Sequence, residues 1–141
     1  MDTLSSSRRS WNMSRIRGRD TAPELRVRSA LHRAGLRFRL HRRDLPGTPD
    51  IVLPRFKTVI FVHGCFWHRH EGCKYAYMPK SRIEFWVEKF SKNVERDRRK
   101  ILQLQQAGWN VEIIWECETT DTVTLSRRLD FLPVSAGEDT K

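Results

Sequence analysis

The stretch DIVLPRFKTVIFVHGCFWHRHEGC, residues 50–73, holds two apolar segments followed by a run of unusual composition. The segments 50–53 and 58–63 are short, rich in β-branched residues and bounded by breakers, which predicts two buried strands. The run 63–73 then crowds three histidines, two cysteines and two aromatic residues into eleven positions. A hydrophobic core has no need of so many nitrogen and sulfur donors, so we expect an irregular loop that carries chemistry.

The sequence on either side predicts helices and further short strands. Thr21-x-x-Glu24 and Ser81-x-x-Glu84 have the pattern of capping boxes, which mark helix starts. Helices are expected over 22–34, from 81 to about 107 and over 121–131, strands over 38–41 and 110–115, and a turn over 45–49. This succession predicts an α/β domain built around a small mixed sheet.

The composition favours a polyanionic partner. The chain of 141 residues carries 27 Lys and Arg against 17 Asp and Glu, a formal net charge of +10, which suits nucleic acid first and an anionic membrane surface second. No apolar run approaches the roughly 20 residues of a membrane span, and the first residues lack the apolar segment of a signal peptide. We therefore expect a cytoplasmic protein that is not bound to a membrane, with a basic arm over 1–18, one folded domain over 19–132 and a disordered tail over 133–141.

The cysteines predict a metal site. Three is an odd number, which argues against a disulfide framework. The spacing Cys65-x4-His70-x2-Cys73, with Cys117 at the end of a predicted strand, makes one set of three thiolates and an imidazole. Zinc accepts four such ligands tetrahedrally, and a closed set leaves no position for water, so the site would be structural. The alternative is three unrelated cysteines.

Four polar residues are candidates for a functional role, and each has a structural alternative. Asp50 begins an apolar strand, although a strand-initiating turn residue would look the same. On the long helix, Asn93 and Asp97 fall within the stripe of apolar residues that faces the core, where a carboxylate is costly without compensation. Pairing of Asp97 with a neighbouring arginine on a solvated face is the alternative. Glu24 is explained by its capping box alone.

At this level of detail the chain resembles the very short patch repair (Vsr) endonucleases. The matching motifs are RGRDTAPE (17–24), LPGTPDIV (45–52), HGCFWHRH (63–70), EFWVEKFSKNVERDRRK (84–100) and GWNVEIIWEC (108–117). The resemblance implies a restriction-endonuclease-like fold of the PD-(D/E)-x-K type with a structural zinc. It also implies a bacterial, cytoplasmic, nucleoid-associated enzyme that uses magnesium to nick double-stranded DNA 5′ of the thymine in T:G mismatches left by deamination of 5-methylcytosine.

The resemblance also assigns roles to individual positions. Asp50 would be a magnesium ligand together with the backbone carbonyl of Val62, where the family commonly has threonine. His68 would be the general base, and Asp97 would orient it. Glu24 and Asn93 would hold metal-bound waters. The zinc ligands match as Cys65, His70, Cys73 and Cys117, with one residue more between His70 and Cys73 than the family pattern has.

Aromatic and N-terminal residues would contact the DNA. The resemblance implies that Phe66, Trp67 and Trp86 intercalate beside the mismatch, where a mispaired step is easier to unstack. Ordinary core packing is the alternative, above all for Trp86. Lys89 would read the mismatch or its phosphates, and the arm with Asn12 and Met13 would lie on the minor groove. From the residues alone the arm is only basic, which neutralises phosphates without reading sequence.

We therefore expect a monomeric, magnesium-dependent, mismatch-directed nicking endonuclease, which the family suggests is assisted by the mismatch-repair protein MutL. A restriction-like nuclease of the same fold without mismatch preference is one alternative. A non-catalytic, zinc-stabilised DNA-binding module is the other, and it has no need of Asp50, His68 and Asp97 together.

Overall fold

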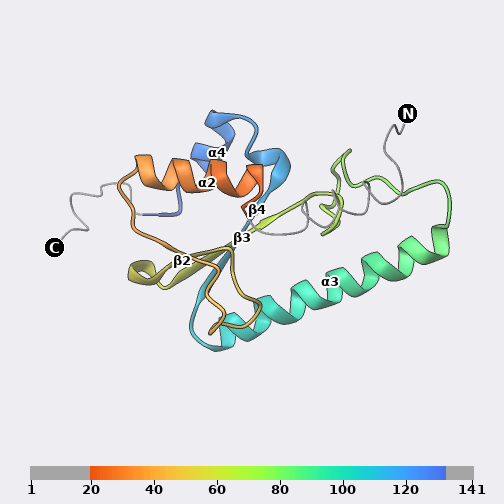
Figure 1. The fold of residues 1–141 in the computed structure, drawn as a ribbon, viewed down its shortest axis with the longest axis horizontal. Helices are drawn as coiled ribbons and strands as arrows, with labels where there is room; N and C mark the ends of the chain where they lie inside the picture. Colours follow the sequence, from red (N-terminus) through yellow and green to blue (C-terminus); the bar gives the residue numbers. More distant parts are fainter. Residues whose placement is uncertain (1–19, 133–141) are drawn as a thin grey trace.

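The computed structural model describes residues 20–132, and these form a four-stranded sheet with helices on both faces (Figure 1). The basic arm, with Asn12 and Met13, and the tail 133–141 lie outside the described residues. The elements in chain order are α2 (Ala22–Arg33), β1 (Arg39–Leu40), β2 (Ile51–Leu53), η1 (Pro54–Phe56), β3 (Thr58–His63), α3 (Ile83–Gln106), β4 (Asn110–Trp115), η2 (Glu116–Glu118) and α4 (Thr122–Arg128). None of the described helices is both long and apolar enough to cross a membrane.

The sheet is mixed, with strand order β1-β2-β3-β4. The first three strands are antiparallel neighbours, and β3 pairs with β4 in parallel. A parallel pair needs a long crossover connection, and here the loop 64–82 and α3 provide it. This topology brings the start of β2 close to the C-terminal ends of β3 and β4, at the end of the sheet where the loop begins.

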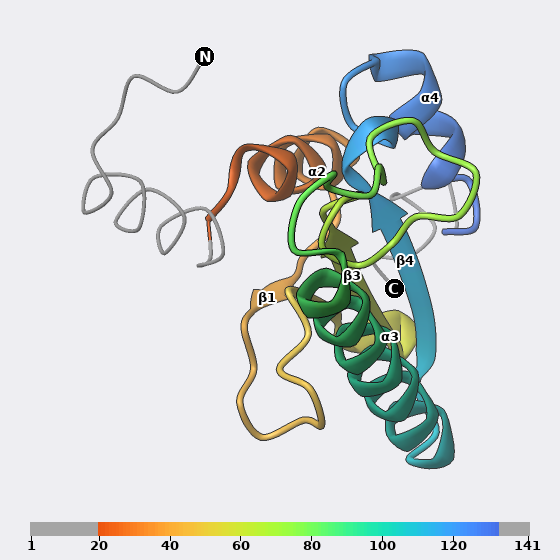
Figure 2. The same ribbon diagram turned by 90° about the vertical axis from the view of Figure 1, so that its right-hand side faces the viewer.

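Alternation along β3 divides the core into two layers. Ile60 packs with α2 and α4 residues, including Leu31 and Leu125, while Val59 and Phe61 pack with Leu104 of α3. Successive side chains of a strand point to opposite faces, so one buried strand serves both layers. Figure 2 shows the same division, with α2 and α4 on one side of the sheet and α3 on the other.

Most of the predicted elements are confirmed, with one error at a helix start. The strands 58–63 and 110–115 have their predicted bounds, and α2 begins at its predicted cap, where Thr21 Oγ1 accepts from the Glu24 N–H at 3.4 Å. The capping box predicted at Ser81 is wrong. Arg82 is the N-cap of α3, its φ of 56° lies in the left-handed region, and no side chain caps the first turn. Because Arg82 adopts this conformation, the N-cap lies one residue later than predicted, and Ser81 does not cap the helix.

Candidate active site

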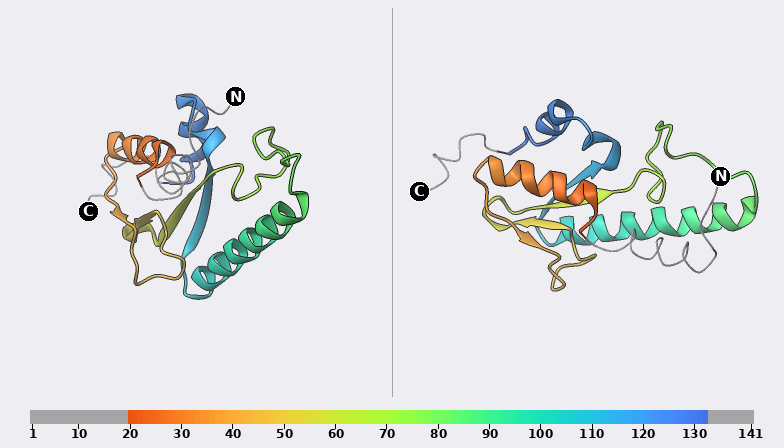
Figure 3. Two further views of the ribbon diagram at one scale, coloured as in Figure 1. Left: turned by 45° about the vertical axis from the view of Figure 1, so that its right-hand side comes forward. Right: turned by 45° about the horizontal axis from the view of Figure 1, so that its top comes forward.

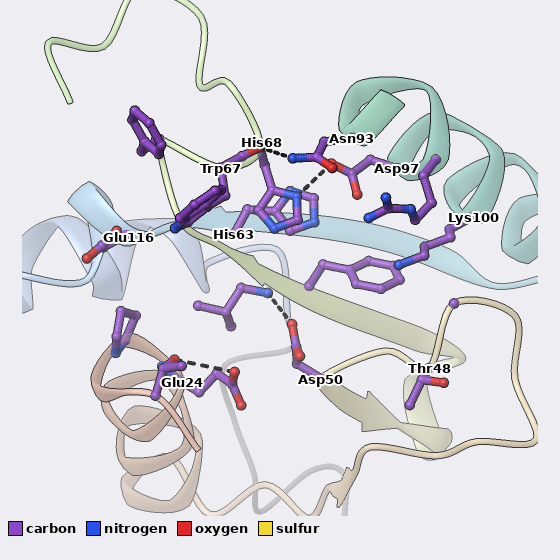
Figure 4. Close-up of a pocket in the computed structure, with 18 of the residues that line it drawn as sticks. Glu24, Thr48, Asp50, His63, Trp67, His68, Asn93, Asp97, Lys100 and Glu116 are labelled. Atoms are coloured by element: carbon purple, nitrogen blue, oxygen red, sulfur yellow. Dashed lines mark hydrogen bonds and ion pairs between the residues drawn. The ribbon is translucent and has the colours of Figure 1, made fainter. Parts of the chain in front are cut away.

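A cleft of about 810 Å³ opens at the end of the sheet where the loop begins. Its walls come from α2, from the segment before β2, from the end of β3 with the following loop, and from α3 (Figure 4). Figure 3 shows that α3 extends beyond the sheet, so its first half lies beside the loop and its second half beside the strands. Segments far apart in the sequence therefore meet in this cleft, as its polar lining shows: Glu24, Thr48, Asp50, His63, His68, Lys89, Asn93, Arg96, Asp97, Lys100 and Glu116.

Asp50 lies on the floor of the cleft, directly before β2. Its Oδ2 accepts a hydrogen bond from the Val62 N–H at 2.8 Å. Burial raises the pKa of Asp50 to about 7, and the nearby charge of Glu24 adds to the rise, although the Val62 hydrogen bond opposes it. A buried carboxylate beside a second acidic group favours a bound cation, and carboxylate oxygens are the ligands that Mg²⁺ prefers.

His68 and Asp97 form a close pair across the cleft. Nδ1 of His68 lies 2.6 Å from Oδ2 of Asp97. Burial would raise the pKa of Asp97, but the hydrogen bond to His68 and its charge outweigh burial and lower it. An ionised carboxylate only accepts hydrogen bonds, so Nδ1 carries the proton and Nε2 keeps a lone pair for a proton acceptor's role. The alternative in which Asp97 pairs with a neighbouring arginine is wrong.

His63 packs against the His68 side of this pair. Its ring stacks on the His68 ring with centroids 3.8 Å apart and planes at 8°. Burial lowers the pKa of His63 to about 3, and the charge of His68 contributes to the drop. His63 is therefore neutral at physiological pH, so it packs against His68 without adding a second charge to the cleft.

Asn93 and Glu24 reach the cleft from opposite sides, and each forms a hydrogen bond with a backbone group. Asn93 is 7% exposed on the core-facing stripe of α3, as predicted, and its Nδ2 donates to the Trp67 carbonyl at 3.1 Å. Glu24 is 4% exposed; it accepts from the Asp20 N–H at 3.1 Å and from the Arg28 guanidinium at 3.3 Å. The capping role of Glu24 and its place in the cleft therefore coexist.

A second cluster, the cysteine cluster, consists of Cys65, His70 and Cys73 of the loop and Cys117 of η2. One ligand atom from each lies within 4.8 Å of the others, and His70 Nδ1 is 3.5 Å from Cys117 Sγ. Three thiolates and an imidazole at this spacing fit one tetrahedral ion. Between His70 and Cys73, Gly72 adopts a φ of 78°, a conformation that glycine takes at little cost.

The three aromatic side chains predicted to contact DNA pack against one another, and two of them, Phe66 and Trp67, line the cleft. The Phe66 ring lies 5.0 Å from Trp67 and 5.6 Å from Trp86, and the two indoles are 6.1 Å apart. All three are half-buried, and Phe66 also contacts the buried Phe90 at 5.1 Å. Each ring thus has a packed side and an exposed side, so packing and DNA contact are compatible.

Sequence reasoning missed two basic residues, Arg69 and Lys100. Arg69 donates to the carbonyls of Phe66, Ala76 and Tyr77 at 2.8–3.1 Å. These partners lie in an irregular loop, and no sequence pattern predicts them. Lys100 lines the cleft. Counted at 100° per residue it falls about 60° from Asp97 on the helical wheel, so the apolar stripe could have revealed it.

Comparisons with known proteins find related sequences. A family model described as DNA mismatch endonuclease Vsr matches residues 1–74. The chain is 52% identical over 128 residues to the type II nicking enzyme V.XorIIP of Xanthomonas oryzae, covering 91% of this chain and 93% of that protein. It is 52% identical over 116 residues to the DNA mismatch endonuclease Vsr of Escherichia coli, covering 82% and 74% respectively. A type II nicking enzyme of Neisseria meningitidis, V.NmeAIP, is 41% identical over 131 residues, covering 93% of both chains.

Proposed function

The chain belongs to the Vsr family of DNA mismatch endonucleases, and from this premise we propose that it nicks DNA 5′ of the thymine in T:G mismatches, with magnesium as cofactor. The single observation that carries the proposal is the meeting of Asp50, His68 and Asp97 in one cleft, with His68 held by Asp97 at 2.6 Å. A DNA-binding module has no use for a metal-ligand carboxylate opposite an oriented imidazole.

Phosphodiester hydrolysis assigns distinct tasks to these side chains. Asp50 and the carbonyl of Val62 would hold magnesium, which supplies positive charge to the phosphate when bound. His68 Nε2 takes a proton from the attacking water, whose oxygen bonds to phosphorus while one bridging P–O bond breaks. Asp97 keeps Nδ1 protonated and stabilises the imidazolium that forms. Glu24 and Asn93 would orient waters at the metal.

The cysteine cluster would hold a structural zinc ion. Its four ligands come from both sides of His68 in the chain and from η2, so a bound ion would tie the loop to the sheet. In this proposal the zinc takes no part in the chemistry. It fixes Cys65 and His70, and thereby restricts where His68 between them can lie.

The three aromatic residues would find the mismatch. A T:G step is easier to unstack than a paired one, and an inserted ring replaces part of the lost stacking. Phe66, Trp67 and Trp86 are the proposed wedges, with Lys89 on the next turn of α3 at the adjacent bases or phosphates. Asn12 and Met13, outside the described residues, would contact the opposite groove.

A strand-specific nicking assay tests the proposal. Two duplexes that differ only in T:G against C:G within a CC(A/T)GG-type site would be incubated with the protein, with and without Mg²⁺, beside Asp50→Ala. We expect magnesium-dependent cleavage of the thymine-containing strand alone, absent in the variant. Cleavage of both duplexes would assign the restriction-like alternative, and binding without cleavage, also with randomised flanks, would assign the binding module.

The partners follow from the same proposal. The enzyme would act as a monomer on duplex DNA, and MutL would assist it. Sedimentation of the protein on a T:G duplex, with and without MutL, tests both points: we expect one protein chain for each duplex and a heavier complex when MutL is present.

A further inference from the structure

Lys100 is a cleft residue whose charge is not neutralised by a direct partner among the described residues. The residue is half-buried on α3, three positions after Asp97. Within residues 20–132 it takes part in no hydrogen bond and no ion pair, although it lines the cleft with Asp50 and Asp97. A cation that lines a cleft without a hydrogen-bonded or ion-paired partner is typical of a site that receives an opposite charge from a ligand.

The backbone at Gly47 holds the lysine stem in this position. A Cβ atom added to Gly47 would lie 2.7 Å from Cδ, 2.8 Å from Cγ and 2.9 Å from Cβ of Lys100. These are distances that two non-bonded carbons do not tolerate, so only a residue without a side chain lets the stem lie against the turn before β2. Gly47 also has a φ of 75°, which favours glycine independently.

The charge of Lys100 acts on the reacting groups. It lowers the pKa of Asp50, of Asp97 and of His63, so the ammonium lies within electrostatic reach of all three. Figure 4 shows the side chain extending from α3 toward the cleft, on the same wall as Asp97. Two further cations, Lys89 and Arg96, also line the cleft. Both lie on turns of α3 that come before Lys100.

We propose that Lys100 is a catalytic residue whose ammonium donates to a non-bridging oxygen of the phosphate that is cut. This inference rests on the proposed nuclease function and extends it. Negative charge builds on those oxygens as water adds to phosphorus and the bridging P–O bond breaks. Lys100 remains protonated throughout and transfers nothing. A donor aimed at developing charge stabilises the transition state more than the ground state.

The test separates chemistry from general attraction to DNA. Lys100→Met keeps the apolar stem against Gly47 and removes the charge, and Lys100→Arg keeps the charge. Arg99→Gln is the matched control, because it removes one exposed charge from the position directly before Lys100 on the same helix. For each zinc-loaded, full-length protein, the nicking rate of a T:G duplex is measured in single turnover at saturating protein, and the duplex Kd is measured without Mg²⁺.

We expect Lys100→Met to lower the single-turnover rate by about 100- to 1,000-fold relative to Arg99→Gln, the range seen when a single donor to a developing oxyanion is removed. Its Kd should differ from that of Arg99→Gln by no more than about threefold, which also shows that the variant is folded, and Lys100→Arg should recover at least a tenth of the rate.

Two results would overturn the role of Lys100 while leaving the nuclease proposal intact: a Lys100→Met rate within threefold of the control, or a loss confined to Kd. A wild-type protein that cuts no duplex would instead overturn the nuclease function and this inference with it.

Discussion

His68 and His70 stand two positions apart in one loop, yet they belong to two different sites. His68 donates to the carboxylate of Asp97 at 2.6 Å and faces the cleft. His70 lies 3.5 Å from the Cys117 sulfur, and its ring stacks on Trp115 at 4.2 Å. The same side chain thus pairs with a carboxylate in one site and lies among thiols in the other. The partner brought by the fold makes the difference.

The two sites also differ in their relation to stability. The cysteine cluster is closed: each ligand can be satisfied by one ion, so a bound metal stabilises the fold. The cleft gathers Asp50, Glu24, His63 and Lys100 around open space, and the raised pKa of Asp50 shows that its ionised form is disfavoured there. Changes in the cleft should therefore abolish activity without loss of stability, and changes in the cluster should lower both.

The largest effect on activity is expected from Asp50→Asn. Loss of the carboxylate proposed to hold magnesium should lower nicking by at least about a thousandfold, in line with the loss of a central catalytic group. In the absence of Mg²⁺ the variant should nevertheless be more stable than wild type above pH 7, by about 1–3 kcal/mol. Nicking assays and urea unfolding of the zinc-loaded proteins measure the two effects.

The stability difference between Asp50→Asn and wild type should depend on pH. Asp50 has a folded pKa of about 7 against roughly 3.9 when unfolded, so wild type binds a proton on folding between these values. Its stability from this group is complete below pH 4 and is lost as the pH rises toward 7. The advantage of Asp50→Asn should therefore vanish near pH 4. An advantage independent of pH would contradict the assignment.

Asp97→Asn should produce the next largest loss. An amide can donate to Nδ1 of His68 and so stabilise the tautomer that lacks a lone pair at Nε2. We expect nicking to fall by about a hundredfold or more with an unchanged duplex Kd. Glu88→Gln, which removes an exposed carboxylate from the same helix, should nick as wild type does. Equal losses in both variants would refute the orienting role.

Cys117→Ser tests the closed site. Removing one thiolate should lower zinc affinity and reduce the free energy of unfolding by about 2–5 kcal/mol, because metal binding contributes directly to folding. Activity should fall by about 10- to 100-fold as the loop loses its anchor. Zinc content by elemental analysis and thermal unfolding measure these effects. Retained zinc and unchanged stability would show that Cys117 is not a ligand.

Arg69 stands between the two histidines and should have the smallest effect. Its guanidinium binds three loop carbonyls and lies 3.8 Å from the Phe90 ring. Arg69→Gln should lower stability by about 1–3 kcal/mol and nicking only several-fold, since both sites keep their own partners. Arg69→Lys should recover less than half of the lost stability, because an ammonium cannot reproduce the planar fork. Thermal unfolding of both variants decides this.

Patterns in the sequence predicted the strands 58–63 and 110–115 with their bounds, because each is a compact β-branched run between breakers. They also placed Asn93 and Asp97 on the buried stripe of α3, since helical periodicity is local. They failed at Ser81, where the backbone of Arg82 turns through the left-handed region. They passed over Arg69, whose partners are carbonyls of a loop without regular geometry.

The sequence by itself determined the elements, the basic character and the ligand types, because periodicity, charge and donor chemistry are properties of neighbouring residues. Only the tertiary structure decided which donors meet. The parallel pairing of β3 with β4 carries Cys117 to Cys65, and the crossover through α3 carries Asp97 to His68. Contacts between residues 29 or 52 positions apart depend on the path of the whole chain, which no local pattern encodes.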